Sequence, residues 1–449
     1  MKKFETGLDW AGEAPAEPHG SINFENGGSP GGSASQFFHS FPSKGESVPK
    51  EEIFMSKIAK VEVLPLALSN KPNNQTDCDG TVDTLVVRIT DEDGRCGIGE
   101  CDAPPSVVKA FLEMPGAHIW SMNPIGILMG RDPLEAPAIW QRLYEATNYP
   151  GRRGSGIHAI SAMDIALYDL AGKQAGKPVY KLLGGAKREF LTPYATIFQG
   201  MPQGRSLSQM MDVTQKLFDK AIQIGFRAVK MEVLFYDLVT DRQLVEVIKE
   251  GRRMLGDEIT MMVDFGYRWR DWHAAKWVLD RIEDCNIYFA EATLQHDDLY
   301  GHARLSESCG IRICGAEQAA TRWEIHEWIQ TGKVAIVQPD INRCGGLSEI
   351  RRIAELAELY GVQVVPHGWK TGITAACGRH FQASTLNAEA FEFLSPYLYD
   401  SPLRQSLVSP EPMIVNGRME LPAAPGLGVD LDEETVRKGL AGFEALQTG

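Results

Sequence analysis

The alternation of apolar and polar residues changes character along the chain. Residues 1–53 show no apolar period and are rich in Gly, Ser and Pro, which predicts an extension without a core of its own. Apolar residues then alternate in IAKVEVLPLAL and DTLVVRITDEDGRCGIGEC, which predicts antiparallel strands with a turn at 92–94. Helical spacing follows over 132–184, with a break at 146–156. The pattern therefore predicts an α+β domain at 54–188.

Beyond residue 188, short β-rich runs alternate with stretches of helical periodicity such as DRQLVEVIKEGRRML. The runs are TPYATI, AVKMEV, ITMMVDFG, YFAEATL, IRICGAE, AIVQPDI, VQVVPHGW and FEFL. Eight such strands at regular spacing predict an α/β fold with one parallel barrel at 189–402. Residues 403–449 form a further segment, which contains a hairpin-like stretch and a turn marked by Gly and Pro.

Three acidic residues each close an apolar run in the barrel region. MMVD ends at Asp264, IYFAE at Glu291 and IRICGAE at Glu317, at intervals of 27 and 26 residues. Because the C-terminal ends of barrel strands lie at one face, these carboxylates are expected to converge. Three hard oxygen ligands suit Mg²⁺, which keeps positions free for water and substrate oxygens. The spacing therefore predicts a metal site, although each acid taken alone is equally compatible with a solvated loop.

Composition and charge restrict the class of protein. The chain has 449 residues, 43% hydrophobic and 23% charged, as is usual for soluble globular proteins. Its formal charge of −14 and pI near 5.3 argue against nucleic acid or an anionic membrane surface as partners. No apolar run has the length of a membrane span, and the N-terminus lacks a signal-peptide pattern. The eight cysteines form no CxxC pair, so we expect a cytoplasmic protein without structural disulfides or a zinc site.

Two motifs and the order of the acids resemble a known family. The helix AMDIALYDLAGKQAGKPVYKLLGG and the tail PGLGVDLD are similar to the corresponding segments of the enolase superfamily, specifically its mandelate racemase subgroup. The resemblance covers roughly 54–435. It implies a modified (β/α)₇β barrel under an α+β capping domain, which the C-terminal segment completes. It also implies Mg²⁺ held by Asp264, Glu291 and Glu317, an enolate intermediate, and a homo-oligomer of two to eight subunits.

The resemblance further implies a dyad of Asp340, on the sixth strand, and His367, on the seventh. A histidine of ordinary basicity can remove the proton next to a carboxylate if a cation stabilises the enolate. The subgroup places a K-x-K pattern on the second strand, whereas this chain has Lys230-Met231-Glu232. Glu232 cannot act as a lysine base, so a racemase with a base on each face is disfavoured. Glu232 remains a candidate carboxylate base or a partner of Lys230.

Other positions are candidates for substrate contacts. Relatives place a carboxylic acid at the position of Glu392, where it hydrogen-bonds the substrate carboxylate; the alternative for this residue is a buried salt bridge. In this family the capping loops set specificity, and here these are 69–80 and 146–156. The weaker candidates, any of which could be scaffold or solvated, are Lys71, Tyr149, Arg152, Arg153, Asn342, Arg343, Trp369 and Lys370.

The sequence therefore predicts a Mg²⁺-dependent dehydratase that acts on a small-molecule carboxylate, an aldonic or aldaric acid. It would abstract the α-proton and expel the β-hydroxyl to give a 2-keto-3-deoxy acid. The alternatives are an epimerase, a racemase or a lactone cycloisomerase that uses the same enolate chemistry. A non-catalytic protein that binds a sugar acid is a further alternative.

Overall fold

The computed structural model describes residues 56–69, 81–235 and 238–448. The predicted N-terminal extension and Lys71 lie outside the described residues. Residues 54–449 cluster into one compact unit, which contains both the α+β part and the barrel.

The α+β part begins with the predicted meander. Strands β1 (Ile58–Ala67), β2 (Asp83–Asp91) and β3 (Cys96–Cys101) pair antiparallel in that order, so this prediction is confirmed. The helices that follow are α1 (Pro105–Leu112), α2 (Pro124–Leu128), α3 (Ala136–Ala146), α4 (Asn148–Gly151), α5 (Ser155–Ala175) and α6 (Val179–Leu182). The break expected at 146–156 therefore contains the short helix α4. Helices α1 and α2 lie in a stretch for which no element was predicted.

Helix α5, the helix of the resembling motif, packs directly against β3. Its middle is buried on every side, since sixteen of its residues are inaccessible to solvent. Two glycines of β3 make the close approach possible. A Cβ at Gly97 would lie 2.2 Å from the carbonyl oxygen of Ala166, and one at Gly99 would lie 2.2 Å from that of Ala162. Glycine is therefore required at both positions.

Eight parallel strands form the barrel sheet, in the order β10-β9-β8-β7-β6-β5-β4-β11. They are β4 (Pro193–Ile197), β5 (Ala228–Glu232), β6 (Thr260–Asp264), β7 (Ile287–Glu291), β8 (Ile313–Gly315), β9 (Ile336–Val337), β10 (Gln363–Val364) and β11 (Phe391–Glu392). Seven of them lie within runs predicted from the sequence, and β7 begins one residue before its run, at Ile287. The last strand, β11, pairs with the first, β4, and the backbone N–H of Glu392 donates to Pro366 just after β10. The sheet thus curls round on itself, as a modified TIM barrel requires.

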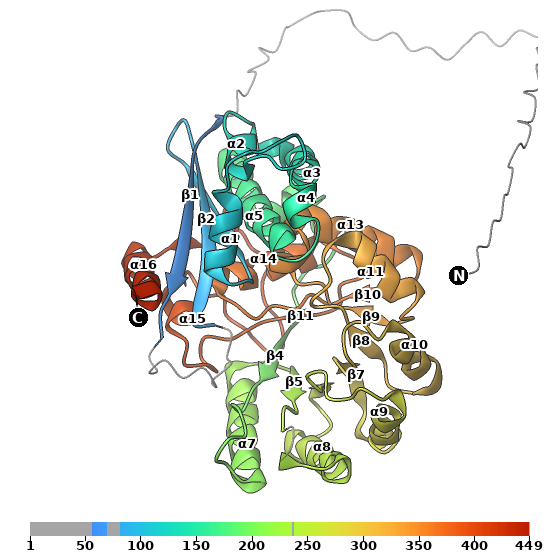
Figure 1. The fold of residues 1–449 in the computed structure, drawn as a ribbon. Coiled ribbons are helices and arrows are strands. Elements are labelled where there is room, and N and C mark those ends of the chain that lie inside the picture. The colour runs from blue at the N-terminus through green and yellow to red at the C-terminus, as the bar shows by residue number, and fades with distance from the viewer. Residues whose placement is uncertain (1–55, 70–80, 236–237, 449) are drawn as a thin grey trace, which may run out of the picture. The chain divides into compact units, whose positions relative to one another are not determined.

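One long helix follows each of the first seven barrel strands, and Figure 1 shows those after β4 to β8 on the outside of the sheet. These helices are α7 (Leu207–Ile224), α8 (Asp241–Leu255), α9 (Trp272–Leu279), α10 (Leu299–Ser308), α11 (Thr321–Gln330), α13 (Gly346–Leu359) and α14 (Gly372–Ser384). The expected (β/α)₇β arrangement is therefore confirmed.

The C-terminal segment returns to the α+β part. It contains α15 (Pro402–Ser406), the paired strands β12 (Val408–Ser409) and β13 (Asp430–Leu431), and α16 (Glu433–Thr448). Helix α16 packs on β1. No helix was predicted in this segment, although the buried residues Val436, Gly439 and Phe443 have helical spacing. In the part of the chain that the structure describes, no helix is long and apolar enough to cross a membrane.

Candidate active site

The three predicted metal ligands lie at the same end of neighbouring barrel strands. Asp264 is the last residue of β6 and Glu291 the last of β7, and the two are paired in register. Glu317 follows the end of β8 by two residues. Asp264 and Glu291 are buried. The three acids thus lie at the same face of the barrel, at the C-terminal ends of neighbouring strands.

A buried lysine links these acids. The ammonium of Lys230, on β5, lies 2.9 Å from Glu291, 3.0 Å from Glu392 and 3.6 Å from Asp264. Burial lowers the pKa of Lys230, but Glu291 and Glu392 outweigh it and raise that pKa well above its usual value. Lys230 is therefore a fixed positive charge. Glu291 also accepts a hydrogen bond of 2.7 Å from the side-chain amide of Gln338.

Glu317 is held by a tyrosine that the sequence analysis did not single out. The hydroxyl of Tyr267 donates to Glu317 at 2.7 Å, and the other carboxylate oxygen of Glu317 lies 3.7 Å from Nε2 of His367. The backbone of Tyr267 has a positive φ of 61°. Its N–H donates to Ala292 at 2.6 Å, and its carbonyl accepts from Gln295 at 2.7 Å. These two bonds hold a backbone conformation that non-glycine residues rarely adopt.

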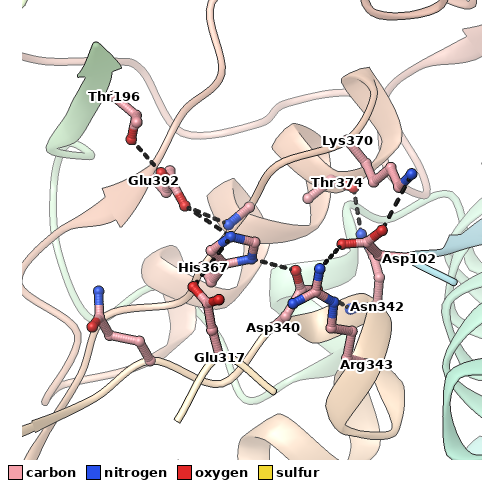
Figure 2. A network of polar contacts seen from close by, with 12 residues as sticks. Asp102, Thr196, Glu317, Asp340, Asn342, Arg343, His367, Lys370, Thr374 and Glu392 are labelled. Atoms are coloured by element: carbon pink, nitrogen blue, oxygen red, sulfur yellow. Dashed lines mark hydrogen bonds and ion pairs between the residues drawn. The ribbon is translucent and has the colours of Figure 1, made fainter. Parts of the chain in front are cut away.

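His367 and Asp340 form the predicted dyad. Asp340 lies at the end of the β9 run, at the N-cap of the short helix α12 (Ile341–Cys344), and His367 follows β10. Nδ1 of His367 lies 2.6 Å from Asp340, so Nε2 faces Glu317 and Glu392 (Figure 2). Burial lowers the pKa of His367, but Glu317, Glu392 and Asp340 together raise it to about 10. With only protein charges around it, the imidazole therefore holds a proton.

Glu392, on β11, makes the buried ion pair that was the alternative for this residue. Besides Lys230, it accepts hydrogen bonds from the hydroxyl of Thr196 and, at 2.8 Å, from the backbone N–H of Gly368. Burial raises its pKa, but Lys230 and His367 lower that pKa to about 2. Glu392 is therefore ionised and accepts hydrogen bonds in this arrangement.

A cavity of about 420 Å³ opens between these residues. Glu232, at the end of β5 and paired in register with Asp264, contributes to its wall. Burial and Asp264 raise the pKa of Glu232 well above its usual value. The residues that line the cavity are Phe198, Lys230, Glu232, Leu234, Asp264, Gly266, Tyr267, Glu317, His367, Trp369 and Glu392.

The weaker candidates after the dyad separate into two groups. Trp369 lines the cavity, as the sequence analysis allowed. Arg343 and Lys370 do not line it, and both bind Asp102, which follows β3 (Figure 2). Asn342 is buried and donates to the hydroxyl of Thr374 at 2.5 Å. Arg343 and Lys370 therefore link the barrel to the α+β part, whereas Asn342 makes a contact within the barrel.

The candidates from 146–156 lie away from the cavity. Tyr149 is 70% exposed and stacks on Trp120 with ring centroids 5.3 Å apart. Arg153 forms an ion pair of 2.7 Å with Glu324 on α11, and Arg152 is exposed. None of these three side chains lines the cavity, so their binding of substrate stays a prediction. Lys71 belongs to the other predicted loop, outside the described residues.

Two apolar residues that line the cavity were not among the candidates predicted from the sequence. Phe198 and Leu234 each follow a barrel strand, β4 and β5, and line the cavity. Their position just after a strand was a usable signal, but apolar residues there are also common in cores. Glu100 and Asp102, at the end of β3, support the segment after His367, and their acidity within the apolar run CGIGECD was the signal available.

The three acids fit Mg²⁺ in their chemistry, but their side chains do not form a closed ligand shell in this arrangement. No three His, Cys, Asp or Glu side chains in the described residues surround one point as metal ligands do. The ammonium of Lys230 lies between Glu291 and Asp264 instead. The donor set is nevertheless suitable, because it consists of hard oxygens on neighbouring strand ends. Burial raises the pKa of Glu291 to about 8, although the positive charge of Lys230 lowers that pKa. The cluster of carboxylates therefore carries too little positive charge to keep all of its members ionised, and a bound cation would supply more.

Comparisons with known protein families cover both parts of this fold. Residues 65–184 match the model of the mandelate racemase / muconate lactonizing enzyme N-terminal domain. Residues 213–435 match the enolase C-terminal domain-like model. The two matched segments correspond to the α+β part and to most of the barrel with the returning segment.

Characterised relatives are similar over most of their length. An arabinonate dehydratase of Saccharolobus solfataricus is 33% identical over 80% of this chain and 90% of its own. An L-rhamnonate dehydratase of Saccharopolyspora erythraea is 32% identical, over 78% and 84% respectively. A D-galactarolactone cycloisomerase of Agrobacterium fabrum is 30% identical, over 78% and 90%.

Solved structures are also similar to this chain in fold and sequence. A protein provisionally named a racemase is 44% identical, with a TM-score of 0.80, over 85% of this chain and 98% of its own. A racemase from Streptomyces coelicolor A3(2), solved with bound magnesium, is 26% identical, with a TM-score of 0.72, over 85% and 99%. With both family models matched and relatives covered almost end to end, this chain belongs to the mandelate racemase / muconate lactonizing enzyme family of the enolase superfamily.

Proposed function

We propose that this enzyme dehydrates a sugar acid to a 2-keto-3-deoxy acid in a Mg²⁺-dependent reaction. The observation that carries the proposal is the imidazole of His367, which points Nε2 into an acidic cavity while Asp340 holds Nδ1. The similarity to an arabinonate dehydratase and an L-rhamnonate dehydratase supports a sugar acid as substrate.

Asp264, Glu291 and Glu317 would hold the ion. Bound there, Mg²⁺ would supply the positive charge that stabilises the substrate carboxylate as its α-proton leaves. It would also neutralise part of the charge of Glu317, which raises the pKa of His367. Nε2 of His367 would take the α-proton, and the electrons of the C–H bond would move toward the carboxylate. Asp340 would stabilise the imidazolium and fix its tautomer.

Elimination follows from the same geometry. The electrons return to form the double bond between the α- and β-carbons, the bond to the β-hydroxyl breaks, and the imidazolium protonates the departing oxygen, which leaves as water. The enol product then becomes the 2-keto acid. This sequence needs a base on one face of the substrate, which suits a site with Glu232 in place of the second lysine.

A product assay tests the reaction. The Mg²⁺-loaded enzyme is incubated with a panel of aldonic and aldaric acids, and 2-keto acid is measured. We expect at least one acid to yield product, and EDTA to abolish the yield. Failure of an enzyme shown to retain Mg²⁺ to eliminate water from every acid of the panel would contradict the proposal.

The variant His367→Asn tests the role of the imidazole. Asparagine keeps a polar side chain but cannot accept the α-proton. Loss of a general base costs about 10²- to 10⁴-fold in rate, so kcat should fall by at least that factor. Full turnover by this variant would remove His367 from the mechanism.

A second reaction, lactone cycloisomerisation or epimerisation through the same enolate, is favoured by one observation. The D-galactarolactone cycloisomerase is about as similar to this chain as the dehydratases are. Turnover in D₂O separates the reactions, because epimerisation introduces deuterium at the α-carbon without loss of oxygen.

The division of the chain belongs to the same proposal. We assign residues 1–53 to an extension, 54–188 to the capping domain, 189–402 to the catalytic barrel and 403–449 to a segment that completes the cap. The cytoplasmic location and the homo-oligomer of two to eight subunits stay predictions, and sedimentation of the purified enzyme would test the latter.

A further inference from the structure

A second cavity lies at the end of the barrel opposite the carboxylate cluster, and we call it the basal cavity. Its volume is about 830 Å³, against about 420 Å³ for the cavity at the active site. Phe190, just before β4, lines one side, and residues from the stretch 410–428 line the other. Leu191 and Met419 exchange backbone hydrogen bonds of 2.8 and 2.9 Å, which join the two sides. Because β4 begins here and runs parallel to its neighbours, the basal cavity lies at the N-terminal ends of the strands.

Arg379, on α14, places a guanidinium group in the wall of the basal cavity. Its Nε is buried and has no hydrogen-bond partner among the described residues, and a terminal nitrogen donates to the carbonyl of Glu420 over a long 3.5 Å. Burial lowers the pKa of Arg379 to about 10, an effect that Glu411 opposes. Both carboxylate oxygens of Glu411 bind Arg404 instead, at 3.0 and 2.5 Å. A buried cation in this state is costly, and an oxyanion placed against it would relieve that cost.

A second guanidinium group borders the same cavity. Arg418 is exposed and lies over the ring of Phe190, 3.8 Å from its centroid. A guanidinium stacked on a ring still presents the N–H groups of its edge to an acceptor in its own plane. Glu189 and Glu420 also border the cavity, but both are exposed and stay hydrated. The basal cavity therefore offers donors to a negative charge, with the buried donor at Arg379.

The remaining side chains of the lining are apolar. Among them, Met413 is 81% exposed and Val415 is 67% exposed, and Leu421 and Pro422 line the same cavity. Large apolar side chains that gather in water around a cavity gain by contact with an apolar ligand. The lining thus combines a charged group with an apolar surface.

We infer that the basal cavity binds a monocarboxylate with an apolar chain of about six to ten carbons, such as a medium-chain fatty acid. Its carboxylate would accept hydrogen bonds from the planar guanidinium of Arg379, with Arg418 at the mouth, and its chain would cover Met413. A phosphate monoester fits less well, because Glu189 and Glu420 would repel its second negative charge. The site is separate from the active site, so the inference does not rest on the proposed reaction.

Four probes test the inference by titration calorimetry on the Mg²⁺-loaded enzyme. Octanoate has both the charge and the chain, 1-octanol lacks the charge, acetate lacks the chain, and octyl phosphate carries the second charge. We expect octanoate to bind at least tenfold more tightly than 1-octanol or acetate, because hydrogen bonds to a charged group and the buried chain each contribute that much. Octyl phosphate should bind no more tightly than octanoate. If octanoate binds no better than 1-octanol or acetate, or if octyl phosphate binds best, the inference is overturned.

The variant Arg379→Gln tests the head-group contact. Its affinity for octanoate should fall at least tenfold, whereas the control Arg281→Gln should bind octanoate as the wild type does. Arg281 is exposed, stacks on Trp277 at 3.8 Å and lies on the segment between α9 and β7, away from this lining. Equal affinities in the two variants would contradict the site. Loss of octanoate binding in His367→Asn but not in Arg379→Gln would place the ligand in the active site and would also overturn the inference.

Thermal unfolding separates a lost ligand site from a lost fold. Without ligand, Arg379→Gln should unfold at or above the wild-type temperature, because the substitution removes a buried cation that lacks a close acidic partner. Octanoate should raise the unfolding temperature of the wild type and leave that of Arg379→Gln unchanged. An unliganded variant that unfolds below the wild type would show that Arg379 supports the fold itself, against the inference.

Discussion

At the scale of single residues, one position distinguishes elimination from racemisation. Lys230 and Glu232 stand two apart on β5, so both side chains face the same side of the sheet. Lys230 forms ion pairs with Glu291 and Glu392. Glu232 lines the cavity beside Asp264, with which it is paired in register. A lysine in place of Glu232 would add a second cationic base and relieve the excess of acids. Its absence is the sequence feature that favours elimination over racemisation.

Tyr267 is expected to position Glu317 for metal binding, since its hydroxyl donates to that carboxylate. Groups that orient metal ligands contribute about 10- to 100-fold to affinity. The variant Tyr267→Phe should therefore weaken Mg²⁺ binding by that factor, measured by titration calorimetry without substrate.

Tyr194→Phe provides the control for this measurement. Tyr194 is also buried, but its hydroxyl has no hydrogen-bond partner in the described structure. Removing that hydroxyl should leave Mg²⁺ affinity close to the wild-type value. Equal losses in the two variants would show that Tyr267 acts through general packing.

At the scale of elements, the sequence predicted the strands well because each barrel strand is buried on both faces and reads as a continuous apolar run. Even the two-residue strands β9 and β10 fall inside such runs. The same criterion did not predict α16, because its polar residues outnumber the buried residues that have helical spacing. Partners across the fold, such as Asp102 with Arg343, could not be predicted, because nothing local specifies a contact between residues 241 positions apart.

The end of β3 is expected to stabilise the segment that carries His367. Glu100 accepts from the hydroxyl of Thr371 at 2.9 Å, and Asp102 binds Lys370 at 3.2 Å. Burial raises the pKa of Asp102, but Lys370 and Arg343 lower it to about 2. Asp102→Asn would remove the anionic partner of the buried Lys370 and of the half-buried Arg343, so the free energy of unfolding should fall by about 3 kcal/mol.

Urea unfolding measures that loss, and kcat should fall with it because the His367 segment is less well fixed. The control is Asp93→Asn, which removes an exposed pair with Arg95 in the turn between β2 and β3. That change should cost less than about 1 kcal/mol. A similar cost for both variants would argue against a special role for the end of β3.

At the scale of the whole molecule, the sequence predicted which residues lie at the strand ends of the barrel, whereas the packing of the loops above them could not be predicted. The acids and the dyad were predictable because each residue ends a barrel strand, and the fold brings all strand ends together. Tyr149 and Arg153 contact Trp120 and Glu324 and are not among the residues that line the cavity. Where a loop packs depends on contacts between the cap and the barrel, which no local pattern encodes.

The junction of cap and barrel also sets the pH dependence of stability. Asp164, in the middle of α5, accepts a 2.8 Å hydrogen bond from the backbone N–H of Ser348 on α13, and its other oxygen has no partner among the described residues. Burial raises the pKa of Asp164 to about 7. The neutral carboxyl is therefore the form that the folded protein favours. Its contribution to stability is fully present below about pH 4 and is lost as the pH rises through about 7.

Asp164→Asn should remove this pH dependence, because asparagine keeps an acceptor for Ser348 and cannot ionise. Relative to wild type, the free energy of unfolding of the variant should rise by about 1.4 kcal/mol for each pH unit between about 4 and 7, and then level off. Urea unfolding of both proteins at pH 5, 6, 7 and 8 measures this difference. The lowest pH is the internal control, since there both side chains are largely neutral in the folded state. A difference that stays constant from pH 5 to 7 would mean that Asp164 ionises in the folded protein without cost, and that α5 meets the barrel through a hydrated junction.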